Sequence, residues 1–249
     1  MLNIVRINDS ILGDQESLNA FLKDFAAIHN PKILVHGGGA LPDWLAERLG
    51  IENGIEVKDA ESMQLAAMLY AGLANKILVA RLQAYGCDAL GLSGADANII
   101  PTVKAGAQNS YVGNVQPYKI SGDTLDNILN EGLTPVFCPI THDGKGDLLY
   151  SDTDSVAAGL AAAMVRAEQV RLTYCIEEDG LYDGVNGDTS LIHSLSAAVF
   201  EEKKEHGTLP DDTAQKLSYA VSLVRAGVKE VAFKRPENLT KGIGTFVKA

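Results

Sequence analysis

The chain has 249 residues, 46 % of them hydrophobic, and a formal net charge of −11 at pH 7. That length and apolar content suffice for one large core or for two closely joined lobes. The acidic balance argues against nonspecific nucleic-acid binding, and no run approaches the ~20 apolar residues that a membrane span needs.

The N-terminus and the cysteines indicate the compartment. The chain begins with the strand-like Leu2-Asn3-Ile4-Val5 and shows no basic region followed by an apolar core, so we expect no secretion signal. Cys87, Cys138 and Cys175 lie far apart among apolar neighbours, and neither they nor the five histidines show metal-ligand spacing. The sequence therefore predicts a cytoplasmic protein with reduced, buried thiols and no protein-held metal.

Strand-like and helical segments alternate through the first half of the chain. Strands are expected at 2–7, 32–35, 87–92 and 134–140, and a hairpin at 98–104 with 110–116. Helices are expected at 15–28, 59–85 and 121–130. Asp59 is a good N-cap residue for the longest of them, and Asn8-Asp9-Ser10 is typical of a turn.

The second half continues the alternation. Helices are expected at 152–167, 195–205 and 212–226, and strands at 170–176 and 230–233. Crossovers of this length predict an α/β fold with a mainly parallel central sheet between two helical layers, a three-layer α/β/α arrangement. We expect one domain over residues 1–249, with an N-terminal lobe of about 1–150 and a C-terminal lobe of about 151–249.

One stretch combines a buried strand with consecutive glycines. Lys32-Ile33-Leu34-Val35-His36 runs directly into Gly37-Gly38-Gly39, and the next segment, 40–49, has helical spacing. Backbone N–H groups of glycines at a helix start form a compact anion site, because no Cβ blocks them and the helix dipole adds positive charge. A glycine turn that only packs the strand on the helix is the plain alternative.

Charged residues are expected at the same edge of the sheet. Ligands of open α/β sheets bind beyond the carboxyl ends of the strands, where Arg6, Asp152-Thr153-Asp154 and Lys216 fall. Two cations and a carboxylate around a glycine floor suit phosphoryl transfer. Helix caps and a solvated helix lysine are the ordinary alternatives. Neither a P-loop nor a G-x-G-x-x-G after a strand is present.

The order of several short motifs resembles the amino acid kinase family over almost the whole chain. The matching segments are Val35-His36-Gly37-Gly38-Gly39, Asn53-Gly54 with Asp59-Ala60-Glu61, Ala71-Gly72-Leu73-Ala74-Asn75-Lys76, Gly91-Leu92-Ser93-Gly94-Ala95-Asp96, Tyr111-Val112-Gly113-Asn114-Val115, Asp154, Lys216 and Gly242-Ile243-Gly244-Thr245. The branch it resembles phosphorylates the side-chain carboxylate of N-acetyl-L-glutamate with ATP and Mg²⁺, giving an acyl phosphate for arginine biosynthesis.

The resemblance also implies residue roles. Gly38 and Gly39 would hold the acidic substrate and the moving phosphoryl group. Lys216 would contact that group, and Asp154 would orient the cations. The segment from Tyr174 through Gly180 to Leu181, with Pro210, would line the nucleotide site. Relatives pair through the N-terminal lobe, so a homodimer is expected.

The motifs also depart from the family at several positions. Arg6-Ile7-Asn8-Asp9 stands where the family has K-x-G-G, which puts an arginine in place of a lysine and adds a carboxylate at Asp9. Glu56 and Tyr150 replace a substrate-binding arginine and asparagine. Two further hypotheses therefore stay open: an impaired member that binds a ligand or a partner, and a kinase for carbamate, aspartate or a nucleotide.

Overall fold

The computed structural model describes residues 1–29, 31–37, 48, 55–106, 110–184 and 190–248. Gly38 and Gly39 therefore lie outside the described residues.

The helices and strands of the described chain follow the predicted alternation. The strands are β1 (Leu2–Arg6), β2 (Lys32–Val35), β3 (Ala89–Leu92), β4 (Thr102–Lys104), β5 (Gly113–Val115), β6 (Thr134–Phe137), β7 (Ile140–His142), β8 (Leu148–Tyr150), β9 (Val170–Cys175), β10 (Tyr182–Asp183), β11 (Ser190–Leu191), β12 (Ser194–Ser196), β13 (Glu230–Lys234) and β14 (Thr245–Lys248). The α-helices are α1 (Asp9–Gly13), α2 (Gln15–Ala26), α4 (Ala60–Ala66), α5 (Asn75–Ala84), α6 (Gly122–Asn130), α7 (Thr153–Met164), α8 (Ala197–Glu205) and α9 (Asp211–Arg225). Four short segments complete the elements: the π-helix η1 (Ala67–Ala74) and the 3₁₀ turns η2 (Asp96–Asn98), η3 (Pro117–Lys119) and η4 (Pro236–Asn238).

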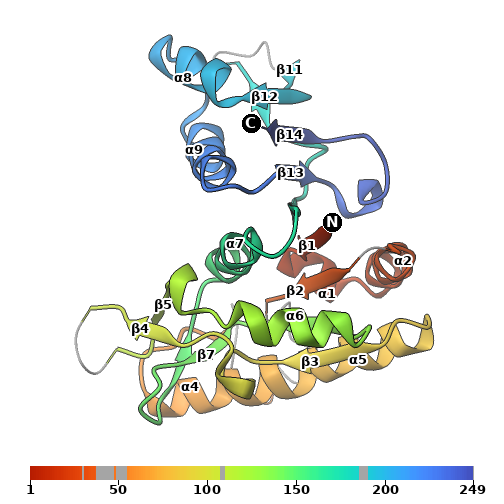
Figure 1. Cartoon of the computed structure of the whole chain (residues 1–249), viewed down its shortest axis with the longest axis vertical. Coiled ribbons are helices and arrows are strands. Elements are labelled where there is room, and N and C mark those ends of the chain that lie inside the picture. Colours follow the sequence, from red (N-terminus) through yellow and green to blue (C-terminus); the bar gives the residue numbers. More distant parts are fainter. Residues whose placement is uncertain (30, 38–47, 49–54, 107–109, 185–189, 249) are drawn as a thin grey trace.

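One sheet of eight strands runs through both halves of the molecule, in the order β12-β14-β13-β9-β1-β2-β6-β3. Its neighbouring strands pair in parallel except for β13 with β14. In Figure 1 the N-terminal half lies below β1 and the C-terminal half above it, so that β1 and β9 join the halves. The mainly parallel sheet between helices confirms the predicted fold class.

Alternate residues of the central strands bury against opposite helical layers. Ile4 and Ile33 belong to a core that includes α7 and α9, whereas Val5 and Leu34 belong to a core that includes α2 and α5. Figure 1 shows α7 and α9 on one side of the sheet and α2 on the other. Because successive strand residues point to opposite faces, apolar runs without alternation are what a sheet buried on both faces requires.

The long helical stretch predicted at 59–85 is continuous, but its middle is π-helical. Asp59 caps it as predicted: its carboxylate accepts from the N–H of Ser62, whose hydroxyl in turn accepts from the N–H of Asp59. The stretch Ala60–Ala84 is long and apolar enough to cross a membrane by length and composition, although a core helix passes the same test. Met63, Leu78 and Leu82 are buried against the rest of the protein.

Two local predictions were wrong. Asn8-Asp9-Ser10 begins α1 instead of forming a free turn, with Asn8 as its N-cap; caps and turns use the same residue types for the same reason, a side chain that bonds the nearby backbone. The run 134–140 is two strands: β6 ends at Phe137, and β7 begins at Ile140, after Pro139. The three cysteines are buried thiols, as predicted.

Candidate active site

The carboxyl ends of four parallel strands meet at one level of the sheet. Arg6 of β1 pairs with Val35 of β2 and with Tyr174 of β9, and Tyr174 pairs with Phe233 of β13. Gly37 follows β2 after His36, and α7 begins nearby at Thr153, whose hydroxyl accepts from Arg6. This edge is where an open α/β sheet binds its ligand.

Arg6 and Asp154 form the ion pair at this edge. Arg6 Nε lies 2.6 Å from Asp154 Oδ1 and donates to Thr153 Oγ1 at 3.3 Å. Among the described residues these contacts all use Nε, which leaves the two terminal nitrogens of the guanidinium for an anion. Burial raises the pKa of Asp154, the charges of Asp152 and Asp9 raise it further, and Arg6 and Lys216 oppose the shift.

Lys216 is carried by α9, which begins after Pro210. Its side chain is 45 % exposed, and its Nζ lies 3.7 Å from Asp212 Oδ2 one turn earlier. Its charge lowers the pKa of Asp154, which places the lysine within electrostatic reach of the Arg6–Asp154 pair. Tyr219, one turn after Lys216, also faces this carboxylate: burial raises its pKa to about 12, and Asp152 and Asp154 add to the shift. The sequence analysis missed Tyr219, although its i, i+3 spacing from Lys216 puts both on one helix face.

Asp9 lies against the first glycine of the glycine segment. A Cβ placed on Gly37 would collide with the Asp9 carboxylate, so Gly37 is the residue that lets α1 sit so close to the end of β2. The charge of Asp9 also raises the pKa of Asp154 and of Tyr150. The carboxylate of Asp9, which the family motif lacks, therefore lies beside Gly37 and close to Asp154 and Tyr150.

The two residues that replace family substrate contacts are placed differently. Tyr150, at the end of β8, is half-buried, and its ring centroid lies 6.1 Å from that of Tyr70. Burial raises its pKa to about 12, and Arg6 is close enough to oppose the shift. Glu56 is exposed, and its carboxylate lies 2.7 Å from Lys58 Nζ. The structure thus brings Tyr150 to the Arg6 group, while Glu56 pairs at the surface.

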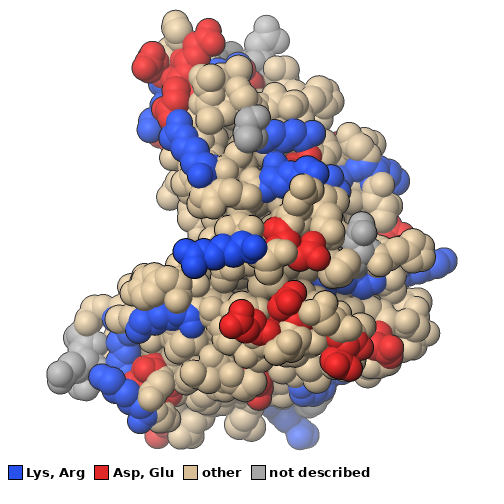
Figure 2. All heavy atoms as spheres, viewed as in Figure 1, with Lys and Arg blue, Asp and Glu red and all other residues tan. Residues whose placement is uncertain are grey.

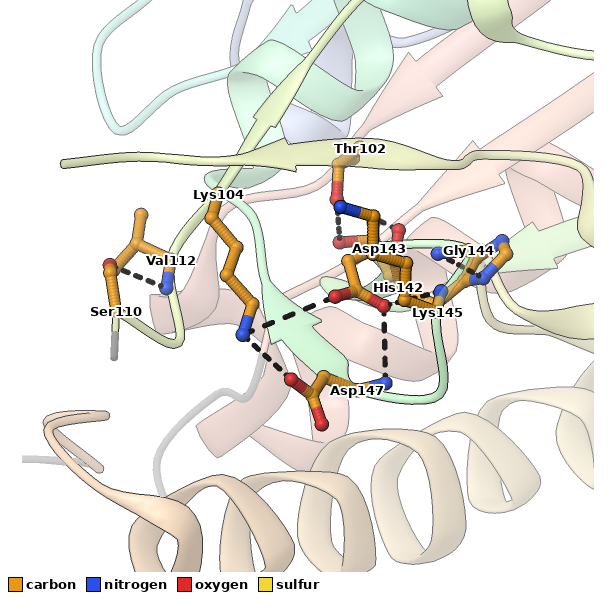
Figure 3. Close-up of polar contacts among 10 residues, drawn as sticks. Thr102, Lys104, Ser110, Val112, His142, Asp143, Gly144, Lys145 and Asp147 are labelled. Carbon is orange, nitrogen blue, oxygen red and sulfur yellow. Dashed lines mark hydrogen bonds and ion pairs between the residues drawn. The ribbon is translucent and has the colours of Figure 1, made fainter. Parts of the chain in front are cut away.

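Polar contacts join the β4–β5 and β7–β8 hairpins, as Figure 3 shows. Lys104 at the end of β4 lies 2.6 Å from Asp147 and 4.0 Å from Asp143, both in the turn between β7 and β8. The Tyr150 N–H donates to Tyr111 O at 2.8 Å, just before β5. The predicted hairpin of 98–104 and 110–116 is therefore present and joined to the strand that carries Tyr150.

Buried hydroxyl groups hold the base of these hairpins. Thr141 Oγ1 lies 3.1 Å from Thr102 Oγ1 and 2.9 Å from Ser151 Oγ, and Ser151 Oγ donates to Gly113 O at 2.9 Å. A Cβ on Gly113 would stand within 3.0 Å of all three hydroxyl oxygens. Glycine is therefore required at this position of the hairpin motif by packing rather than by backbone conformation.

The residues predicted for the nucleotide side lie in the C-terminal half. The Tyr174 ring is buried and stacks on Phe233 with centroids 5.4 Å apart, and its hydroxyl donates to Asp154 O at 3.4 Å. Tyr174 thus contacts the first turn of α7 through its hydroxyl group. Gly180 and Leu181 are buried against Thr245: its Oγ1 accepts from the Leu181 N–H at 2.7 Å.

Thr245→Val is expected to lower the free energy of unfolding by about 1–3 kcal/mol, because the buried Leu181 N–H loses its acceptor while the side-chain volume is kept. Urea unfolding followed by circular dichroism measures the change. Thr245→Ser retains the hydroxyl and serves as the control. A larger loss for serine than for valine would contradict the assigned hydrogen bond.

The carboxylates around Arg6 are of the kind that a hard divalent cation accepts. Asp152 is engaged as the N-cap of α7, accepting from the Ser155 N–H at 2.8 Å, while the Asp154 side chain is 49 % exposed. Among the described residues no group of three or more His, Cys, Asp or Glu side chains is placed to hold a metal by itself. A donor set of one or two carboxylates fits Mg²⁺ that takes its remaining ligands from phosphates and water.

Similarity to known proteins agrees with this geometry. The model of the amino acid kinase family matches residues 1–234. The chain is 37 % identical over 254 residues to the acetylglutamate kinase of Phocaeicola vulgatus, a match that covers 99 % of this chain and 98 % of that protein. It is 41 % identical over 256 residues to the acetylglutamate kinase of Azobacteroides pseudotrichonymphae, with the same coverage.

Solved structures share the fold at lower identity. N-acetylglutamate synthase from Neisseria gonorrhoeae, complexed with coenzyme A and N-acetyl-glutamate, matches with a TM-score of 0.78 at 22 % identity; the match covers 100 % of this chain and 59 % of the synthase chain. Carbamate kinase from Giardia lamblia bound to AMP-PNP matches with a TM-score of 0.68 at 11 % identity, covering 99 % of this chain and 97 % of that one. The likeness to these two structures concerns the fold, whereas the closer sequence matches and the family model assign the relationship. The chain therefore belongs to the amino acid kinase family, as a member of its acetylglutamate kinases.

Proposed function

We propose that this chain transfers the γ-phosphoryl group of ATP to the side-chain carboxylate of N-acetyl-L-glutamate, or of a closely related N-acylglutamate, in arginine biosynthesis. One observation carries the proposal: Arg6 and Asp154 pair at the carboxyl ends of parallel strands in a chain of this family, and Lys216 is near enough for its charge to lower the pKa of Asp154. The family membership supports the reaction class, and the cluster supplies the charges that it needs.

The reaction joins an oxygen of the substrate carboxylate to the γ-phosphorus as the bond to the bridging oxygen of ADP breaks. The protein contributes position and charge rather than a covalent nucleophile. The terminal nitrogens of Arg6 and the ammonium group of Lys216 neutralise charge on the phosphoryl oxygens. Asp154 fixes the Arg6 guanidinium through the 2.6 Å contact to Nε, so that the charge is in place before the phosphoryl group moves.

Mg²⁺ fits the carboxylates at the mouth of the site. Asp9 and the exposed side of Asp154 would hold it together with phosphate oxygens of ATP. A bound Mg²⁺ would supply positive charge that offsets the negative charge of the ATP phosphates. With that ion present, the carboxylate of Asp9 at the former glycine position becomes a favourable partner instead of a repulsive one.

In this proposal, each half of the chain binds one of the two substrates. The N-terminal lobe, about 1–150, holds the acyl-amino acid through Gly38 and Gly39, with Tyr150 beside it and Glu56 at its edge. The C-terminal lobe, about 151–249, holds ATP near Gly180, Leu181 and Pro210. The hydrogen bonds of Thr245 to Leu181 support a fixed backbone on that side.

Trapping of the acyl phosphate with hydroxylamine tests the reaction. Purified protein with Mg²⁺, ATP and N-acetyl-L-glutamate is expected to form a hydroxamate, and omission of either substrate is expected to abolish it. Carbamate, L-aspartate and L-glutamate are tested in parallel by ADP release. Turnover on one of these without turnover on N-acetyl-L-glutamate would replace the proposed acceptor, and ATP binding without any turnover would point to an impaired member.

We further propose that the protein is a homodimer formed through the long helix of the N-terminal half. Met68 is 68 % exposed, and Leu73 and Ile77 are large apolar side chains exposed on the same continuous helical stretch. Contiguous apolar surface of this kind marks an interaction site. A second copy would also cover the apolar exterior of a stretch whose composition alone suits a membrane, which agrees with a cytoplasmic location.

Met68→Glu is expected to convert the dimer into a monomer, because a charge placed at the centre of the apolar surface must be desolvated on pairing. Light scattering coupled to size-exclusion chromatography measures the mass. Tyr118→Glu is the matched control, because Tyr118 is 79 % exposed in η3, outside this helix. A wild-type monomer, or a dimer that persists in Met68→Glu, would contradict the proposed interface.

A further inference from the structure

A buried histidine stands between the sheet and the glycine segment. His36 directly follows β2 and has no exposed surface. Its Nδ1 lies 2.7 Å from Gly37 O, and its Nε2 lies 2.9 Å from the side-chain nitrogen of Asn75, the first residue of α5. The backbone of Gly37 is therefore contacted on its carbonyl by His36 and on its Cα side by Asp9.

The amide of Asn75 has a single consistent orientation. Its Nδ2 donates to Val136 O at 2.9 Å as well as to His36 Nε2. Its Oδ1 accepts from Lys76 Nζ at 3.0 Å, and the same ammonium group donates to Gly91 O at 3.1 Å. If the amide were rotated by half a turn, its oxygen would face the carbonyl of Val136 and its nitrogen the lysine, so both contacts would become repulsive.

The orientation of Asn75 determines the tautomer of His36. Because Nε2 accepts from the amide, the proton of the neutral ring lies on Nδ1, and Nδ1–H donates to Gly37 O. Burial lowers the pKa of His36 to about 4, the carbonyl of Gly37 opposes the shift, and the charge of Lys76 adds to it. The ring is therefore neutral at physiological pH and can act only in this one hydrogen-bonded arrangement.

In the long helix, π-helical turns come immediately before Asn75, the residue that contacts His36. The π-helical turns of η1 end at Ala74, and regular α-helix resumes with Asn75. Such wide turns alter the rotation of the residues that follow and occur at functional sites. Gly91 of β3 completes the fit, because a Cβ there would collide with the Asn75 side chain.

We propose that Asn75 and His36 are positioning residues for phosphoryl transfer: the Asn75 amide fixes the Nδ1–H tautomer of His36, which anchors the Gly37 carbonyl and so sets how the chain leaves β2 toward the glycines. The inference rests on the proposed roles of Gly38 and Gly39 in holding the substrate and the moving phosphoryl group. Neither His36 nor Asn75 touches the reacting atoms. Their action on the reaction passes through the backbone of Gly37.

Nitrogen NMR of the histidine rings tests the anchor without reference to activity. In ¹⁵N-labelled wild-type protein, long-range ¹H–¹⁵N spectra are expected to show His36 with a protonated Nδ1 and a bare Nε2 from pH 8 down to about 5. The other four histidines serve as references in the same spectra: His29, His142, His193 and His206. A protonated Nε2, or titration of His36 near its ordinary pKa, would overturn the inference.

Asn75→Asp links the tautomer to catalysis. An aspartate offers Nε2 an acceptor instead of a donor, so His36 is expected to take up a proton on Nε2 at a pH at least one unit higher than in the wild type. We expect kcat to fall about 10²-fold while the KM for ATP changes little, because the Gly37 carbonyl loses its anchor and the alignment of the moving phosphoryl group is lost with it. Asn127→Asp, the same change on the exposed face of α6, is expected to leave both unchanged.

A second variant guards against a folding defect. Asn75→Ser keeps a polar group but cannot span Val136 O and His36 Nε2 together, and it is expected to lower kcat similarly with native circular dichroism. A wild-type kcat in either folded variant would overturn the inference. Absence of turnover in the wild type would overturn the proposed function instead, and the NMR spectra would still decide whether the anchor exists.

Discussion

Replacement of Lys216 by alanine is expected to lower kcat on N-acetyl-L-glutamate by about 10²- to 10³-fold, the range found when one preorganised charge or donor is removed from a transition state. Lys216 is partly exposed and makes one long ion pair, with Asp212 at 3.7 Å. Its removal is therefore expected to leave the free energy of unfolding within about 0.5 kcal/mol of the wild type. The hydroxamate assay measures kcat, and thermal unfolding measures stability.

Lys23→Ala is the matched control for this experiment. Lys23 is an exposed lysine on α2, a helix on the opposite face of the sheet from α9. It is expected to leave kcat unchanged. Lys216→Arg keeps the charge but replaces a compact ammonium with a planar fork, so only partial recovery is expected. A kcat within threefold of the wild type in Lys216→Ala would remove this residue from the mechanism.

Asp154→Asn is expected to separate activity from stability. The amide no longer fixes the charge of Arg6, and kcat is expected to fall about 10²-fold. The melting temperature is expected to stay the same or to rise, because the environment of Asp154 opposes its charge: burial, Asp152 and Asp9 together outweigh Arg6 and Lys216. Asp123→Asn, in the first turn of α6, is the control for kcat, which it is expected to leave unchanged.

The pH dependence of stability gives a sharper form of this prediction. A carboxyl group whose pKa is raised in the folded protein favours folding when protonated, so its destabilising effect develops as pH rises through the unfolded and then the folded pKa. The melting temperature of Asp154→Asn relative to the wild type is therefore expected to rise with pH across the acid range and to level off above the folded pKa of Asp154. A difference that shrinks with rising pH would show that the Arg6 pair dominates instead.

Three of the departures from the family motif, at Arg6, Asp9 and Tyr150, have a common location in the structure. Arg6 and Asp9 flank the end of β1, and Tyr150 lies close enough to both for their charges to affect its pKa. A lysine-to-arginine change, an added carboxylate and an asparagine-to-tyrosine change thus alter one continuous part of the site. In the proposed mechanism, a bound cation would make the added carboxylate of Asp9 a metal ligand instead of a charge that repels the phosphates.

On the face drawn in Figure 2, acidic and basic side chains are interspersed over both halves of the molecule. Of the charges that the mechanism uses, that of Arg6 is the one withdrawn from this surface. The Arg6 side chain is only 18 % exposed, and its carboxylate partner has one oxygen buried against it. Local burial, not the net charge of −11, governs the electrostatics of the site.

Local sequence patterns determined the elements and the class of fold. Apolar runs without alternation predicted strands buried on both faces, and helical spacing predicted the layers between them. These signals lie within windows of about a dozen residues, so they can be interpreted without knowledge of the rest of the chain. The position of Asp59 as a cap and the buried state of Cys87 could be predicted for the same reason.

The tertiary structure alone decided which of the candidate residues meet. Arg6 and Thr153 are 147 positions apart, and His36 and Asn75 are 39 apart. No local pattern encodes such contacts, because they depend on strand order and on the rotation that η1 gives to α5. The sequence supplied the residue types of a phosphoryl-transfer site. The parallel register of β1, β2 and β9 placed Arg6 level with the ends of β2 and β9, since only the folded sheet aligns the carboxyl ends of strands so far apart in the chain.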